Sequence, residues 1–126
     1  MFYQASWSVL CQPKLNALQY RFALCQVKAA LRIRPDQVRY QTALGAAEYR
    51  MAHYTESRTT LTRIDPLTPV GLVFLALTQC RLGQQEQARR TLDRLREVSA
   101  KREGKKDEKV ESLLCELQSL LTCPTN

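Results

Sequence analysis

The segment FLALTQCRLGQQEQARRTLDRL, residues 74–95, has counterparts earlier in the same chain. An offset of 31 residues aligns Leu75-Ala76 with Leu44-Gly45 and Pro66 with Pro35. An offset of 34 residues then aligns Leu44-Gly45 with Leu10-Cys11. The aligned residues agree in size more often than in identity. Because repeats of this period fold as stacked helical hairpins, the repetition predicts a chain that acts by holding a partner rather than by catalysis.

Three units are visible, at residues 3–35, 37–66 and 68–100. Their apolar residues recur at helical spacing, and no stretch alternates polar and apolar residues for long enough to predict a strand. The chain of 126 residues has the length of a single domain. We therefore predict one all-α domain. Its expected helices cover residues 3–11, 15–34, 37–52, 54–64, 68–82, 85–101 and 107–122.

The first two units have a Trp or a Leu-Gly pair near the start and a closing Pro, and the third matches them best around its turn and second helix. The residues that carry this pattern are Trp7-x2-Leu10, Leu44-Gly45, Tyr54, Gly83, Ala88-x3-Leu92, Pro35 and Pro66. The pattern resembles the tetratricopeptide (TPR) repeat, over about residues 3–100. The resemblance implies an α-solenoid of three helical hairpins. The whole pattern is similar to that of bacterial TPR segments, which often stand at the C-terminal end of larger chains, including kinases.

Some residues depart from the repeat pattern. Pro13 falls where the first helix of a regular repeat would continue and must end that helix early, because proline lacks the amide donor and clashes with the preceding turn. The second unit is shorter than the first, so its second helix should lose most of a turn before Asp65-Pro66. Glu48 stands where an aromatic residue is usual, and a buried carboxylate there would need an arginine or hydroxyl partner.

A charged hinge at residues 101–109 precedes a last helix at residues 107–122. This helix carries one apolar stripe, formed by Val110, Leu113, Leu114, Leu117, Leu120 and Leu121. Because the last unit of a repeat array needs a cover for its exposed face, we expect a capping helix. Self-association through the same leucines is the alternative, with a monomer preferred.

The sequence offers little for catalysis, metal binding or membrane insertion. The single histidine, His53, falls at a predicted turn, and no phosphate-binding loop or catalytic motif is present. The five cysteines form no CxxC pair, and four stand in helical apolar patterns, where we expect reduced, buried thiols. No secretory signal or membrane-spanning run is found. We therefore expect a cytoplasmic, non-enzymatic protein without cofactor or metal.

The TPR resemblance implies a concave groove lined by the first helix of each unit, which binds a peptide. By the repeat register the partner-binding residues are Arg39, Tyr49, Arg50, Phe74, Leu77 and Arg81. Arg50 and Arg81 are equivalent by repeat, and an arginine can hold a carboxylate through two hydrogen bonds. We therefore expect an acidic or amphipathic peptide or protein surface as partner. In the alternative arrangement, Phe74 and Leu77 are packed under a C-terminal helix that folds back into the groove.

The formal net charge of +7 raises nucleic acid as a rival partner. Residues 81–106 hold nine basic and four acidic side chains, and a basic face attracts phosphate without sequence specificity. Every aromatic residue lies at or before Phe74, so this tract cannot stack a base. We interpret the tract as a solvated helix face of mixed charge, and we keep weak nucleic-acid binding as the alternative function.

Overall fold

The computed structural model describes residues 9–10, 15–64, 67–101 and 108–122, and every regular element within these ranges is a helix. The helices are α2 (Ala17–Ile33), α3 (Val38–Arg50), α4 (Tyr54–Thr62), α5 (Pro69–Arg81), α6 (Gln85–Lys101) and α7 (Glu108–Thr122). The all-α prediction is confirmed, and these six helices begin and end within two residues of the predicted bounds. The expected helix 3–11 lies outside the described residues except for Val9 and Leu10, which are helical.

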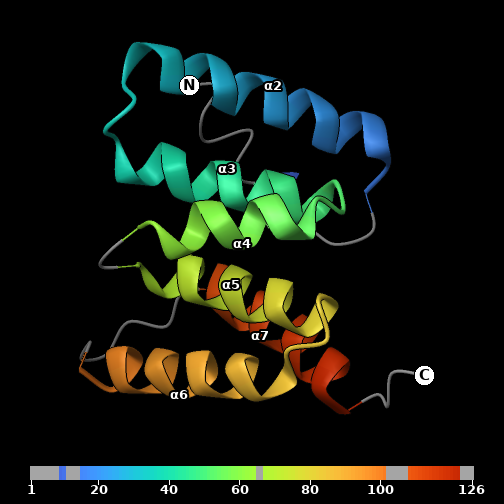
Figure 1. Cartoon of the computed structure of the whole chain (residues 1–126), viewed down its shortest axis with the longest axis vertical. Coiled ribbons are helices and arrows are strands. Elements are labelled where there is room, and N and C mark those ends of the chain that lie inside the picture. Colours follow the sequence, from blue (N-terminus) through green and yellow to red (C-terminus); the bar gives the residue numbers. More distant parts are fainter. Residues whose placement is uncertain (1–8, 11–14, 65–66, 102–107, 123–126) are drawn as a thin grey trace.

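Helices α2 to α6 form a stack in chain order, and each packs against the next (Figure 1). Helix α3 also packs against α5. Helix α7 does not extend the stack. It runs behind α5 in Figure 1 and packs mainly against that helix.

Local signals fix where several helices begin. Asn16 and Gln19 form a capping box at α2. Asn16 Oδ1 accepts a hydrogen bond from the backbone N–H of Gln19 at 2.9 Å, and Gln19 Oε1 accepts one from the backbone N–H of Asn16 at 3.2 Å. At α5, Thr68 Oγ1 accepts from the Gly71 amide at 3.2 Å, and Pro69 occupies the first turn. Between α5 and α6, Gly83 adopts φ +79°, a conformation that glycine reaches without strain.

The length of α4 agrees with the shortened second unit, since α4 has 9 residues and α6 has 17. Pro13, which was predicted to end the first helix, and the Asp65-Pro66 pair both lie outside the described residues.

Small residues let the helices of a hairpin approach closely. A Cβ atom added to Gly45 in α3 would lie 2.6 Å from Cγ of Leu61, which is fully buried in α4. Ser57 Oγ donates to the Gly45 carbonyl at 2.7 Å and lies 3.1 Å from Thr78 Oγ1, so one hydroxyl pair links α3, α4 and α5. Around these contacts, every residue of α5 from Val70 to Cys80 is buried. Helix α5 is therefore the centre of the core.

Glu48 has the hydroxyl partner that its position requires. Thr60 Oγ1 donates to Glu48 Oε1 at 2.7 Å, from α4 to α3. Burial nevertheless raises the pKa of Glu48 above its ordinary value of 4.5, because desolvation disfavours the carboxylate more than this hydrogen bond favours it.

The prediction of four buried cysteines is wrong in part. Cys80 is buried in α5, but Cys25 and Cys115 are exposed free thiols. Both lie on faces of α2 and α7 that point away from the core, which helical spacing alone did not distinguish from the buried faces. Cys11 and Cys123 lie outside the described residues. None of the described helices has the length and apolar character needed to cross a bilayer.

Candidate functional site

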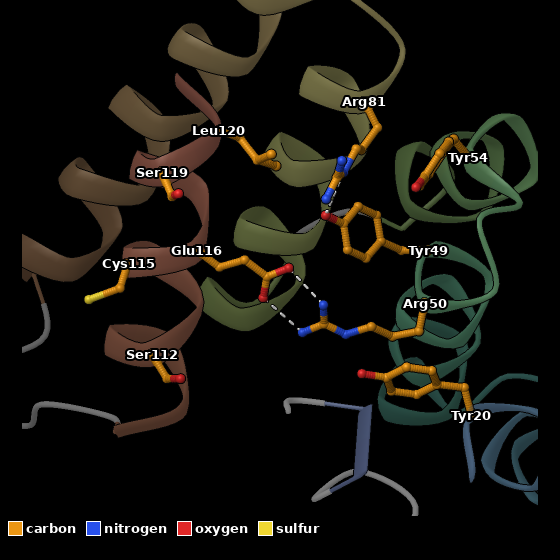
Figure 2. Close-up of a pocket in the computed structure, with 10 residues that line it drawn as sticks. All are labelled: Tyr20, Tyr49, Arg50, Tyr54, Arg81, Ser112, Cys115, Glu116, Ser119 and Leu120. Carbon is orange, nitrogen blue, oxygen red and sulfur yellow. Dashed lines mark hydrogen bonds and ion pairs between the residues drawn. The ribbon is translucent and has the colours of Figure 1, made fainter. Parts of the chain in front are cut away.

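An open pocket of about 600 Å³ lies where α7 faces α3 and α5 (Figure 2). The stack contributes mainly aromatic and basic side chains, whereas α7 contributes small polar residues, a glutamate and a leucine. The lining residues are Tyr20, Tyr49, Arg50, Tyr54, Arg81, Ser112, Cys115, Glu116, Ser119 and Leu120. The pocket thus combines two arginines with tyrosine rings from three helices.

Arg50, at the end of α3, is bound by groups of the chain itself. Its Nη1 and Nη2 atoms donate to Oε2 and Oε1 of Glu116 in α7 at 2.7 and 3.0 Å (Figure 2). Its Nε donates to the Leu10 carbonyl at 2.8 Å. The Arg50 side chain is only 5% exposed and that of Glu116 is 16% exposed. This geometry uses the planar guanidinium to hold one carboxylate at two points.

Three aromatic rings surround the Arg50 guanidinium. Its carbon atom lies 5.4 Å from the Tyr49 ring centroid, 5.5 Å from that of Phe74 and 5.9 Å from that of Tyr20. Rings at these distances attract a cation through their negative faces. Tyr49 also packs edge-on against Phe74, with the ring centroids 6.0 Å apart. Arg50 is therefore fixed in place by both its hydrogen bonds and its aromatic neighbours.

Arg81, at the end of α5, lies in a more open environment. Its Nε donates to Tyr49 Oη at 3.4 Å, and the residue is exposed. This hydrogen bond is the main reason that the pKa of Arg81 is raised. Burial raises the pKa of Tyr49 to about 12, so its hydroxyl stays protonated at neutral pH. Within the described part of the chain, no carboxylate lies within ion-pair distance of Arg81.

The structure places the six predicted partner-binding residues in different environments. Tyr49, Arg50 and Arg81 come together in the pocket, as their repeat positions indicated. Phe74 and Leu77 are fully buried, so the predicted apolar strip is not open to a partner. Arg39 is exposed near the start of α3 and does not line the pocket.

Helix α5 packs against α3, α4, α6 and α7, and α7 buries its own Val110, Leu113 and Leu117 in the same core. The alternative arrangement, with the C-terminal helix folded back into the groove, is the one observed. The leucine stripe is therefore used within the chain.

The predicted site omitted the residues that α7 contributes, Glu116 above all. A repeat register does not indicate on which side of the array a terminal helix will fold. One signal was available, since Glu116 follows Leu113 by three residues and precedes Leu120 by four, and so borders the apolar stripe. An acidic side chain in that place required a basic partner. Tyr20 and Tyr54 were also missed as pocket residues.

The basic tract of α6 has the mixed-charge surface that its sequence indicated. Arg90 pairs with Glu86 at 3.1 Å, and Arg96 lies 3.8 Å from Asp93, all with exposed side chains. These are neighbours along one helix, and such pairs stabilise it only slightly.

Elsewhere in the described residues, no cluster of three or more His, Cys, Asp or Glu side chains could hold a metal ion. His53 is exposed at the N-cap of α4 and does not line the pocket.

Comparisons of the chain with protein-family models, with curated proteins and with solved structures find no match in any of the three.

Proposed function

We propose that this chain is a non-enzymatic protein-interaction module of three TPR-like hairpins, at residues 3–35, 37–66 and 68–100, closed by the helix at 107–122. Its partner is an acidic or amphipathic peptide or protein surface, bound in the groove beside α7. The observation that carries the proposal is the Arg50–Glu116 pair, in which a groove arginine already binds a carboxylate presented by an amphipathic helix.

Arg81 is the residue that receives the partner's carboxylate. It is equivalent to Arg50 by repeat, it is exposed, and it borders the pocket of about 600 Å³. The Tyr49 hydroxyl accepts from Arg81 and keeps its own proton to donate to the same carboxylate. Leu120 and Tyr54 supply apolar surface nearby for a side chain that flanks the acidic one. Arginine and tyrosine are residues that commonly dominate binding energy at protein interfaces.

Fewer residues therefore contact the partner than the six that the repeat register predicted. Tyr49 and Arg81 contact the partner directly, and Arg50 holds α7 as one wall of the site. Phe74 and Leu77 support the site from the core, since a partner reaches them only if α7 leaves. Arg39 is not assigned a role in binding.

A pull-down from a lysate of the source organism, made with and without nuclease treatment, tests this proposal. The bait would be wild-type chain, Arg81→Glu and the matched control Arg94→Glu, which makes the same charge change on the exposed side of α6. A protein retained by wild type and the control but lost by Arg81→Glu is the expected result. Retention of nuclease-sensitive material alone would contradict the proposal and favour nucleic-acid binding by residues 81–106. Equal retention of the same proteins by all three baits would also contradict it.

A further inference from the structure

Helix α2 has an exposed apolar face in addition to its buried one. Leu18, Phe22 and Ile33 are 72%, 65% and 76% exposed, and Cys25 and Ala29 between them are exposed as well. Their spacing of three or four residues places all five on one side of the helix. The buried residues of α2 occupy the opposite side, and they are Tyr20, Ala23, Leu24, Val27 and Ala30. We call the exposed side the α2 outer face.

A row of cations runs along one edge of the α2 outer face. Arg21, Lys28 and Arg32 follow one another at intervals of seven and four residues, which keeps them in line on a helix, and all three are exposed. Helix α2 contains no aspartate or glutamate. Within the described residues, no carboxylate forms an ion pair with any of the three, although Lys28 is near enough to Glu48 to lower the pKa of that carboxyl.

The position of α2 leaves this face accessible. Helix α2 is the first member of the stack and packs mainly against α3, so its other side faces outward at one end (Figure 1). Among the described helices, α2 makes its extensive contacts with α3 alone, so none of them covers the α2 outer face. An exposed stripe of five apolar residues with a polar border is typical of a protein contact rather than of a solvated helix face.

We propose that the α2 outer face is a second docking surface, distinct from the groove, for an acidic amphipathic helix of another protein. The cation row lies on one edge only, so it selects a helix whose glutamates or aspartates run along one edge of its own apolar stripe. The small residues Cys25 and Ala29 lie between larger residues at both ends of the stripe. They leave a shallow middle into which a crossing helix can pack.

Shape and charge argue against two other occupants. A helix that lies in a membrane surface profits from large apolar residues along its whole length, which the centre of this stripe lacks. A second copy of α2 brings no carboxylate to pair with Arg21, Lys28 or Arg32. A protein helix with an acidic edge satisfies both features of the surface.

The test uses the full chain and a labelled helical probe peptide made of leucine, alanine and glutamate, with the glutamates along one edge of the leucine stripe. Binding is followed by fluorescence anisotropy. One variant removes apolar contacts (Phe22→Gln/Ile33→Gln) and another reverses the cation row (Arg21→Glu/Lys28→Glu). The matched control, Arg89→Glu/Arg94→Glu, makes the same charge change on exposed α6 positions. Circular dichroism verifies that each variant keeps its helices, as expected for exposed positions.

Wild type and the α6 control should bind the probe alike, and each α2 variant should bind it at least about tenfold more weakly. A probe with lysine in place of glutamate should not bind. Arg81→Glu removes any share of probe binding that belongs to the groove. In that background each α2 variant should still lower the remaining affinity at least about tenfold, which separates the α2 outer face from the groove.

Equal affinity for wild type and both α2 variants would overturn the inference. Binding to phosphatidylglycerol vesicles without binding to the probe would overturn it in favour of a membrane. A concentration-dependent increase in mass that Phe22→Gln/Ile33→Gln abolishes would overturn it in favour of a second copy.

Discussion

Arg50 in α3 and Glu116 in α7 form a two-point ion pair, with N···O distances of 2.7 and 3.0 Å, across 66 positions of sequence. The pair joins the stack to the helix that covers it, and it lies in a largely buried setting. It therefore determines how α7 sits over α5 and how much of the groove stays open.

Removal of the Glu116 carboxylate should destabilise the fold. Glu116→Ala leaves the buried Arg50 guanidinium without its counter-ion, and loss of one partner of a buried pair lowers the free energy of unfolding by about 3 kcal/mol. Urea denaturation measures this change. The control is Glu111→Ala, an exposed glutamate on the same helix, for which we expect a change within about 0.5 kcal/mol. Equal effects of the two substitutions would show that the ion pair does not stabilise the chain.

The apolar attachment of α7 gives a second prediction. Leu117 is fully buried in the core that α7 shares with α5. Leu117→Ala should lower the free energy of unfolding by about 2–5 kcal/mol through lost burial and the cavity left behind. Amide hydrogen exchange should then be faster in α7 than in α3 and α4. A loss below about 0.5 kcal/mol, the range of ordinary surface changes, would mean that α7 does not pack as described.

The close approach of α3 and α4 gives a third prediction. Gly45→Ala places a Cβ atom 2.6 Å from Cγ of the fully buried Leu61, so the Leu61 side chain must shift within the core. Overpacking costs about 1–3 kcal/mol and outweighs the gain of up to about 1 kcal/mol from replacing glycine within a helix. We expect a net loss of stability in thermal denaturation. The Gly45→Ala/Leu61→Ala double variant should lose less stability than the sum of the losses of the two single variants, since Leu61→Ala makes room for the added Cβ atom. Strict additivity would exclude the clash.

The half-buried carboxyl of Glu48 gives a pH-dependent prediction. Its pKa is raised in the folded chain by burial, so the folded state holds this proton more tightly than the unfolded state does. The resulting stabilisation is fully present below the ordinary value of 4.5 and is lost as pH rises through the raised pKa. Glu48→Gln keeps an acceptor for Thr60 without the charge. Its melting temperature minus that of wild type should therefore increase between pH 4 and pH 7. A difference that stays constant or decreases would contradict this assignment.

The helices could be predicted from the sequence because local signals determine where they begin and end. The turn at Gly83 and the apolar spacing of α6 and α7 act over a few residues, and the observed helix bounds follow them closely. The groove was predicted less well, because its exposure depends on where α7 folds. Phe74 and Leu77 have the same local sequence whether α7 covers them or not. Both residues are fully buried in a helix that packs against α3, α4, α6 and α7, and these contacts join parts of the chain that lie far apart in sequence.

The α2 outer face illustrates the same limit. Helix α2 carries apolar residues on two opposite sides, with Leu18 and Phe22 on the exposed side and Leu24 and Val27 on the buried one. Sequence alone does not reveal which side packs against α3.

Selection of peptides from a random display library by the full chain tests the central claim most directly, since every peptide sequence competes for the groove at once. Selection by wild type, Arg81→Glu and Arg94→Glu would be compared. We predict that wild type and Arg94→Glu enrich peptides with an aspartate or glutamate beside apolar residues, and that Arg81→Glu loses this preference. Enrichment of the same acidic peptides by Arg81→Glu, or no acidic preference in wild type, would contradict an arginine-centred groove for acidic partners.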